Sequence, residues 1–587
     1  MKMKRNIFKL ILLTTIISFS SCETLDLDQT ENPSTLNQSF LDPIYTFNYV
    51  QLQLPVFVNS ANAFTQRVTR QMAMTGGNTY DNSFEPVNFD RNWSQAYNML
   101  NAIKLMEPRA IQDQRYFELG ASKIIRCYVL MTLVDMYGDI PYTEALLGND
   151  NITPKFDSGA SVYAAILAEL DQAMIVIKNP EDRLGDVRQD LYYDEDANKW
   201  VTLAKTLKLK MYITGRLAGS EFGVNDVAGA VTSILDGGDY IDTEAEDFGF
   251  RYGNSRFTPN TRHPLYNDQY EAGGGAYIAN YYMWAMSSEK GFSPVYGNSL
   301  PSGTNDPRLH YYFYKQNPDP SDFNTNTFIL PGRARPSHYN DPQYASEYVA
   351  GVLTPYVVSN WTNTSAAVPA DGFWGRDHGD NAGIPQDNDK RTVGGIYPIG
   401  GQGFINPGTV QTGGTRGLLG AGIMPMLLTS WVHFLKAEAI LELSVAGDAR
   451  AEFLSGINTS IEKVTNFGKD QESYPTLTQN QQSNIAANKI AYPAFMLTKF
   501  DAATGDDRLE IVMKEYYLAA WGNGIETYNN YRRTGFPSNF QPTLQQASGA
   551  FYYRALYSAS TVNNNPNTPA NDRTRRVFWD KANITLH

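Results

Sequence analysis

The residue types that most often carry out chemistry do not form a recognisable catalytic motif in this chain. None of the six histidines belongs to an HExxH motif or to a close pair with the spacing of zinc ligands. The sequence also lacks a GxSxG nucleophile elbow and a GxxxxGKS/T phosphate loop. These patterns therefore favour no class of enzyme.

Three carboxylates have positions that could support acid–base chemistry. Asp135 and Asp139 lie where a helix stops and turns, and aspartates in turns usually cap backbone N–H groups. Glu438 lies on or near the apolar stripe of a predicted helix, and a buried carboxylate must be hydrogen-bonded or neutral. We expect Glu438 to accept hydrogen bonds from a neighbouring element, with Arg532 or Arg533 as candidate donors.

Oxygen-rich clusters raise the question of calcium binding. Neither of the two clusters in the chain follows the twelve-residue order of an EF-hand loop. We therefore expect solvated acidic side chains and predict no cofactor, with a structural calcium ion as the alternative. The first cluster consists of Asp236, Asp239, Asp242, Glu244, Glu246 and Asp247, and the second of Asp387, Asn388 and Asp389.

Aromatic side chains carry the binding hypothesis. The chain contains 37 Tyr, 29 Phe and 8 Trp, and rings in loops give a large, rigid contact area at low entropic cost. Sugars stack on such rings while Asn, Asp and Arg take the hydroxyls, whereas a peptide uses backbone groups and apolar pockets. We predict five ligand-binding residues in aromatic loops: Tyr80, Tyr281, Trp361, Phe373 and Trp374.

Charge and composition limit the possible partners. The chain has 48 Lys and Arg against 61 Asp and Glu, a net charge of −13, and no long basic run, which argues against nucleic-acid binding. The hydrophobic share of 42% is ample for a buried core. Two cysteines give no disulfide framework and no CxxC zinc site, and Cys127, in an apolar run, is expected to be buried.

The N-terminus has the features of a secretory signal peptide over residues 1–21. It combines a basic start, a short apolar stretch and small residues before the cleavage point. The apolar stretch is too short to span a membrane. The small residues that end on Cys22 resemble a bacterial lipobox, which implies that Cys22 is lipidated and that residues 22–38 form a polar linker. An ordinary signal peptide followed by a coincidental cysteine is the alternative.

Hydrophobic periodicity divides the rest of the chain into three regions. Residues 39–236 are predicted to form a helical body, because apolar residues recur at helical spacing. Residues 237–424, rich in Gly, Pro, Asn and aromatics, are predicted to be a loop-rich insert and the candidate ligand-binding region. Residues 425–587 are predicted to complete the body with helices and loops.

Individual helices follow from the same periodicity. In the first region they are predicted around 93–103, 116–136, 161–177 and 200–211, and in the third over 425–443, 484–502 and 508–521. The chain from 522 onward is predicted to be loop-rich. Trp93, Trp200 and Trp431 lie on helical stripes and are expected in the core, while the pattern does not decide between core and surface for Trp521 and Trp579.

Several motifs together resemble the SusD/RagB family of outer-membrane nutrient-binding lipoproteins, most closely its SusD-like branch. The segment 135–142, DMYGDIPY, is similar to a helix-end signature of the family. The segment 375–385, GRDHGDNAGIP, is similar to a loop of the branch, with Gln386 in place of a second proline. The resemblance runs from Cys22 to about Trp579. Other similar segments are 156–173, 199–209 (Thr206 replaces the usual Ser), DPRL at 306–309, FLKAEA at 434–439, and 528–537 (Tyr528 replaces Trp).

The resemblance implies a mainly α fold in which tetratricopeptide-like helix pairs form a right-handed helical body with a large loop-rich insert. It also implies a non-enzymatic lipoprotein, anchored in the outer membrane and exposed at the cell surface. Such a protein sits as a lid on a SusC-like, TonB-dependent β-barrel transporter and traps an oligosaccharide or oligopeptide. The acidic residues after Cys22 resemble the surface-export signal of Bacteroidetes lipoproteins. For Arg376, Asp377 and His378 the resemblance implies a network that fixes a loop.

Two other functions are weighed against this one. A surface glycoside hydrolase needs two carboxylates about 5–10 Å apart, and a sequence can neither show nor exclude such a pair. A structural adhesin predicts long repeated strands, which this sequence lacks. Whether the ligand is a glycan or a peptide is left undecided by the sequence, because aromatic loops serve either class.

Overall fold

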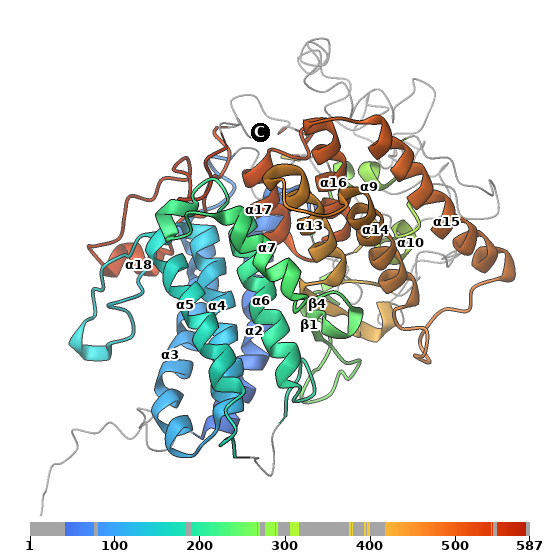
Figure 1. Cartoon of the computed structure of the whole chain (residues 1–587). Coiled ribbons are helices and arrows are strands. Elements are labelled where there is room, and N and C mark those ends of the chain that lie inside the picture. The colour runs from blue at the N-terminus through green and yellow to red at the C-terminus, as the bar shows by residue number, and fades with distance from the viewer. Residues whose placement is uncertain are drawn as a thin grey trace, which may run out of the picture.

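Long helices make up most of the structure, and two short strand pairs lie beside them (Figure 1). This computed structural model describes residues 42–74, 80–183, 189–266, 268–269, 276–287, 289–290, 306–315, 375–376, 378–379, 392–394, 396–399, 417–541, 543 and 549–582. The predicted, mainly helical class is confirmed.

The helices of the N-terminal half pack in sequence, each against the next, on the left and in the centre of Figure 1. Polar side chains begin several of them: Asp42 Oδ1 accepts the Ile44 N–H at 2.8 Å, and Ser158 Oγ accepts the Ser161 N–H at 3.2 Å. The helices are α2 (Pro43–Val68), α3 (Asp90–Gln112), α4 (Tyr116–Tyr137), α5 (Gly159–Ile177), α6 (Ala197–Thr214) and α7 (Val227–Gly237).

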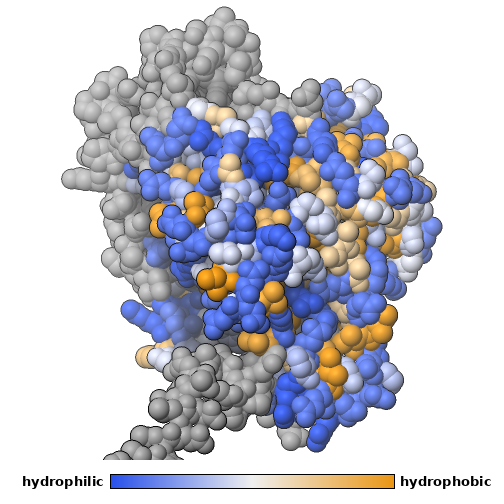
Figure 2. Space-filling model, turned by 90° about the vertical axis from the view of Figure 1, so that its left-hand side faces the viewer, coloured by the Kyte–Doolittle hydropathy of each residue, from blue (hydrophilic) through white to orange (hydrophobic). Residues whose placement is uncertain are grey.

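Helix α5 is apolar enough to raise the question of a membrane span. Among the described residues it alone has the length and hydropathy for one, yet it packs against both α4 and α6 within the helical layer. Figure 2 shows the side of the molecule where α3, α4 and α5 lie; hydrophilic residues cover most of it, and apolar residues occur in small groups. The apolar residues of α5 that face the layer, among them Val162, Ile166 and Leu170, are buried by this packing.

The C-terminal helices pack together on the right of Figure 1. They are α13 (Thr429–Leu443), α14 (Ala449–Asn466), α15 (Gln479–Ala502) and α16 (Asp506–Ala519). The prediction that a helix begins at 425 was wrong. Residues Ile423–Leu427 form strand β4, in which every side chain is buried. Helix α13 begins after it, where the Thr429 N–H and Oγ1 both donate to Asp247 Oδ1 at 2.6 and 2.7 Å.

Helix α17 (Gly524–Thr534) lies where a loop was predicted from 522 onward. Its composition explains the error, because polar and charged residues outnumber the three core residues Ile525, Tyr528 and Tyr531, although every residue of the segment is buried. Asn523 caps its start by accepting the Glu526 N–H at 3.1 Å, and Gly535, with φ of +77°, ends it. Helix α17 packs against α2, α6 and α16 and so joins the two halves.

Glu526 and Arg533 of α17 reach three neighbouring helices. Glu526 forms an ion pair with Lys210 of α6 and accepts the Tyr516 hydroxyl of α16 at 2.8 Å. Arg533 donates Nε and Nη2 to the two oxygens of Glu438 on α13, both at 2.7 Å. The buried charges of α17 are thus paired, while Ile525, Tyr528 and Tyr531 of the same helix pack into the hydrophobic core.

A strand pair brings together the two ends of the predicted insert. Strand β1 (Phe248–Arg251) pairs antiparallel with β4, with Arg251 opposite Ile423. The described parts of the insert add α8 (Pro264–Tyr266), α9 (Asn280–Ser287), α10 (Leu309–Tyr312), β2 (Tyr314–Lys315) and β3 (Thr392–Val393). Their side chains belong to the core, since Tyr282 and Phe313 are fully buried. The C-terminal segment adds α18 (Ala559–Asn564).

We expect Arg533→Met to lower the free energy of unfolding by about 3–5 kcal/mol, because it removes one partner of a buried charge pair and leaves Glu438 with Arg216 alone. Arg450→Met is the matched control, since Arg450 forms an exposed pair with Asp501 and should change little. Urea unfolding followed by circular dichroism measures both. Equal midpoints for the two variants would show that α17 does not depend on this pair.

Candidate ligand-binding site

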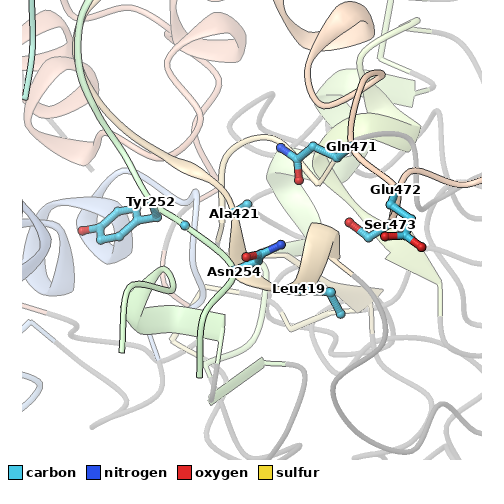
Figure 3. Close-up of a pocket in the computed structure, with 8 residues that line it drawn as sticks. Tyr252, Asn254, Leu419, Ala421, Gln471, Glu472 and Ser473 are labelled. Carbon is cyan, nitrogen blue, oxygen red and sulfur yellow. The ribbon is translucent and has the colours of Figure 1, made fainter. Parts of the chain in front are cut away.

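A cavity of about 660 Å³ lies where three segments meet (Figure 3). One segment follows β1, one is the turn before β4, and the third is the loop between α14 and α15. We call it the β1 cavity. Its volume is in the range of ligand pockets, about 300–1,000 Å³. Its lining residues are Tyr252, Gly253, Asn254, Leu419, Ala421, Gln471, Glu472 and Ser473.

Backbone hydrogen bonds hold the segments that form the β1 cavity. The Tyr252 N–H donates to the Gly422 carbonyl at 2.9 Å, and the Gly253 N–H donates to the Thr261 carbonyl at 2.9 Å. Leu418 and Leu419 have φ of +51° and +56°, a left-handed conformation that costs about 1–2 kcal/mol per non-glycine residue. Two consecutive strained residues at the wall of a cavity indicate a loop whose shape is imposed by its surroundings.

The β1 cavity offers hydrogen-bonding groups rather than an aromatic platform. Asn254, Gln471 and Ser473 can each donate and accept. The Tyr252 ring points away from the other lining side chains in Figure 3 and packs against His263, with ring centroids 4.7 Å apart. Among the lining residues that the structure describes, Glu472 is the single carboxylate, whereas glycoside hydrolysis uses two. The arrangement suits the recognition of hydroxyl or amide groups.

Two of the five predicted ligand-binding residues are buried. The Tyr80 hydroxyl lies 3.0 Å from His378 Nε2, and burial raises the pKa of Tyr80 to about 12. The Tyr281 hydroxyl donates to Asn539 Oδ1 at 2.7 Å and accepts from Lys514 Nζ at 2.5 Å. Neither ring lines the β1 cavity, so their role in binding stays a prediction.

The other predicted sites cannot be placed. Trp361, Phe373 and Trp374 lie outside the described residues, as do Cys22 and the cluster at 387–389. The predicted aromatic platform of the insert therefore stays a prediction, and so does the lipid anchor.

The two turn aspartates have separate partners. Asp135 is buried and accepts hydrogen bonds from the Tyr163 hydroxyl, from Asn529 Nδ2 at 2.8 Å and from Trp579 Nε1 at 2.9 Å. Burial raises its pKa. Asp139 Oδ1 accepts the Gly159 N–H at 3.1 Å and so caps α5, as expected of a turn aspartate. Asp135 differs from that expectation, because all three donors to its carboxylate are side chains.

Glu438 is held by arginine, as expected. Of the two candidate donors, Arg533 makes the bidentate contact, and Arg216 adds an ion pair at 3.0 Å. Burial alone would raise the pKa of Glu438, but Arg533 and Arg216 outweigh it and hold the pKa below its usual value. Arg532 instead donates to the Asp135 carbonyl at 2.7 Å. Glu438 is thus an ionised structural carboxylate.

His378 has the loop-fixing contacts that the sequence implied. Its backbone N–H donates to Gln541 Oε1 at 2.9 Å, and its ring faces Tyr80. Burial lowers the pKa of His378 well below its usual value, so the ring is neutral. Arg376 lies over the Tyr277 ring at 3.9 Å, while Asp377 is outside the described residues.

The first acidic cluster makes protein contacts. Glu246 Oε2 accepts the Asp242 and Thr243 N–H groups at 3.1 and 3.2 Å, and Lys463 pairs with Asp247 at 2.6 Å. Within the described part of the chain, no group of three or more His, Cys, Asp or Glu is arranged to hold a metal ion.

The core tryptophans were predicted correctly, and the cavity was missed. Trp93, Trp200 and Trp431 are buried as predicted, and so are Trp521 and Trp579. Asn254, Gln471 and Ser473 carried no signal in the sequence, because single polar residues in loops are common. Asn254 comes near the α14–α15 loop because β1 pairs with β4.

Comparisons with known proteins agree with this fold. Residues 29–329 match a family model described as "Starch-binding associating with outer membrane", and residues 422–573 match one described as "Susd and RagB outer membrane lipoprotein". No curated protein matches the chain.

Solved structures share the fold at low sequence identity. A chitin-binding SusD homolog from Flavobacterium johnsoniae is similar with a TM-score of 0.60 and 15% identity, over 92% of this chain and 98% of that one. A SusD homolog from Bacteroides fragilis gives 0.58 and 16%, over 91% and 99%. A SusD/RagB family protein from Bacteroides thetaiotaomicron gives 0.58 and 17%, over 91% and 99%. The predicted helical, tetratricopeptide-like architecture is confirmed.

Gly420, between two lining residues of the β1 cavity, gives a test of how tightly this wall is packed. It has φ of +95°, and a Cβ there would lie 2.7 Å from Arg262 Cβ and 3.1 Å from Tyr266 Cγ. We expect Gly420→Ala to lower the thermal unfolding midpoint more than Gly238→Ala does. Gly238 also has a positive φ, +69°, but no atom lies within 4 Å of the position that a Cβ would take there, so its substitution measures only the backbone cost of about 1–2 kcal/mol. Calorimetry of both variants measures the difference. Equal shifts of the unfolding midpoint in the two variants would mean that the wall of the β1 cavity accommodates the added methyl group without strain.

Proposed function

Because the chain belongs to the SusD/RagB family of outer-membrane lipoproteins, we propose that it captures an oligosaccharide at the cell surface and passes it to a SusC-like, TonB-dependent β-barrel transporter. The family match supports a surface nutrient-binding protein. The β1 cavity supports a polar ligand of this kind, because Asn254, Gln471 and Ser473 present amide and hydroxyl groups to one space. Sugar hydroxyls, which both donate and accept, are the natural partners of such groups.

Similar proteins support a glycan rather than a peptide. The matched family is described as starch-binding, and the F. johnsoniae homolog is named as chitin-binding. A binding role also fits the lining, since a single carboxylate does not supply the acid and base of a hydrolase. The binding protein releases its ligand unchanged to the transporter, for which it acts as a lid.

The lipid anchor completes the proposal. Acyl chains on Cys22 would hold the protein at the membrane, since each buried CH₂ contributes about 0.8 kcal/mol and several chains together give a durable anchor. The polar linker 22–38 would let the helical body reach the transporter.

We expect one class of oligosaccharide to bind when the full chain is titrated calorimetrically with malto-, cello- and chito-oligosaccharides and with a mixture of short peptides. Asn254→Ala should weaken that binding about 3- to 10-fold, the loss expected for one or two hydrogen bonds. Asn98→Ala, an exposed asparagine on α3, is the matched control and should bind as the unchanged chain does. Binding of peptides alone, or release of reducing ends from the bound glycan, would contradict the proposal.

Isolation from native outer membranes tests the partner and the anchor. In mild detergent we expect the tagged protein to co-purify with a large β-barrel, and its mature N-terminus to be an acylated Cys22 by mass spectrometry. Cys22→Ser should leave the protein unanchored, while Cys127→Ser, at the buried cysteine, should leave the anchor intact. A protein that purifies alone and unacylated would overturn this part of the proposal.

A further inference from the structure

A second cavity, of about 760 Å³, lies between α15 and the loop that joins α14 to α15. We call it the α15 cavity. Apolar side chains form much of its lining, and amide and charged groups form the rest. Its lining residues are Tyr311, Glu462, Lys469, Gln471, Tyr474, Pro475, Thr476, Leu477, Gln482, Ile485, Ala486, Lys489 and Ile490.

The α15 cavity adjoins the β1 cavity along a single loop. Gln471 lines both of them. The next residues, 472–473, line the β1 cavity, and residues 474–477 line the α15 cavity. Each cavity is large enough for a drug-sized ligand by itself. A ligand that contacts both must therefore be an elongated molecule that passes Gln471.

The two cavities have complementary chemistry. The β1 cavity presents hydrogen-bonding groups, whereas the α15 cavity has the Tyr474 ring, Pro475 and an aliphatic wall that includes Ile490, which is 76% exposed. Sugar rings have both an apolar C–H face and an edge of hydroxyls, so a glycan chain can satisfy the two surfaces in succession. Two charged residues of the α15 cavity pair with each other, since Lys489 Nζ lies 2.6 Å from Glu462 Oε2.

The walls of the α15 cavity are held in place before any ligand binds. Thr478 caps α15 at the end of the loop: Thr478 Oγ1 accepts the Gln481 N–H at 3.3 Å, and Gln481 Oε1 accepts the Thr478 N–H at 2.9 Å. Gln482 Nε2 donates to the Leu477 carbonyl at 2.9 Å. A site whose backbone is already fixed loses less entropy on binding.

The buried side of α15 is fixed by charge. Its Tyr492 hydroxyl donates to Glu515 Oε1 at 2.8 Å, and Glu515 is paired with Lys290 and with Arg308, each at 2.8 Å. Burial alone would raise the pKa of Glu515, but Lys290 and Arg308 outweigh it and hold the pKa at about 2. The ionised cluster ties α15 to α16 and to the insert, so the outer face of α15 keeps its position.

We propose that the β1 and α15 cavities are consecutive subsites of one cleft, and that the cleft selects oligosaccharides longer than a disaccharide. One part of the chain lies against Tyr474 and the aliphatic wall, and the next part hydrogen-bonds to Gln471 and Asn254. This inference rests on the proposed function. It adds the length of the oligosaccharide and the residues that contact each part of it.

The test is a size series of the malto-, cello- and chito-oligosaccharides, from disaccharide to octasaccharide, titrated calorimetrically against the full chain. We expect affinity to rise with length and then level off once both cavities are filled. Tyr474→Ala should weaken the long oligomers about 3- to 10-fold and the disaccharide little, the loss expected for one aromatic contact. Tyr474→Phe, which keeps the ring, should retain the affinity for long oligomers.

Controls separate this inference from the proposed function. Tyr45→Ala removes an exposed tyrosine on α2, outside both linings, and should not change the length dependence. Affinity that is independent of length, or equal loss for short and long oligomers in Tyr474→Ala, overturns the shared cleft while leaving the proposed function standing. Binding of no oligosaccharide at all overturns both. Because Tyr474→Phe keeps the packing, loss of long-oligomer binding in that variant also counts against stacking on the ring.

Discussion

The burial of a polar helix is the constraint on which the rest of the structure depends. Helix α17 has few apolar residues, and each charged group that it buries needs a partner. Those partners come from α4, α6, α13 and the C-terminal segment, through Asp135, Lys210, Glu438 and the Tyr553 carbonyl. Because an unpaired buried charge costs several kcal/mol, an arrangement of the two helical layers that separated these partners would be destabilised.

The cleft follows from that arrangement. Helix α13 is fixed by Glu438 on one side and by the contact of Thr429 with Asp247 on the other, so β4 and β1 meet directly before it. The strand pair places the residues after β1 beside the α14–α15 loop. The wall of the cavity consists of loops that start or end at these paired strands and helices, an arrangement that suits recognition of a ligand by a few well-placed polar groups.

Sequence reasoning succeeded where local patterns decide the structure. Apolar stripes gave the helices α3 to α6 and the burial of Trp93, Trp200 and Trp431, and a glutamate on such a stripe indicated an arginine partner. It failed where distant residues decide. Pro425 lies in a strand because β1 is available to pair with it, and α17 is a helix because other elements supply its polar partners. Asn254 and Gln471 could not be recognised as neighbours before the fold was known.

The hydrogen bonds of Asp135 also tie the N-terminal layer to the C-terminal end of the chain. Its donors are Tyr163, Asn529 and Trp579, and the Arg532 guanidinium binds its carbonyl. Two of the three donors to the Asp135 carboxylate, Asn529 and Trp579, therefore come from the last tenth of the chain, far in sequence from the helix that carries Asp135. Removing the C-terminal segment would therefore leave a buried carboxylate of the N-terminal layer with one donor in place of three.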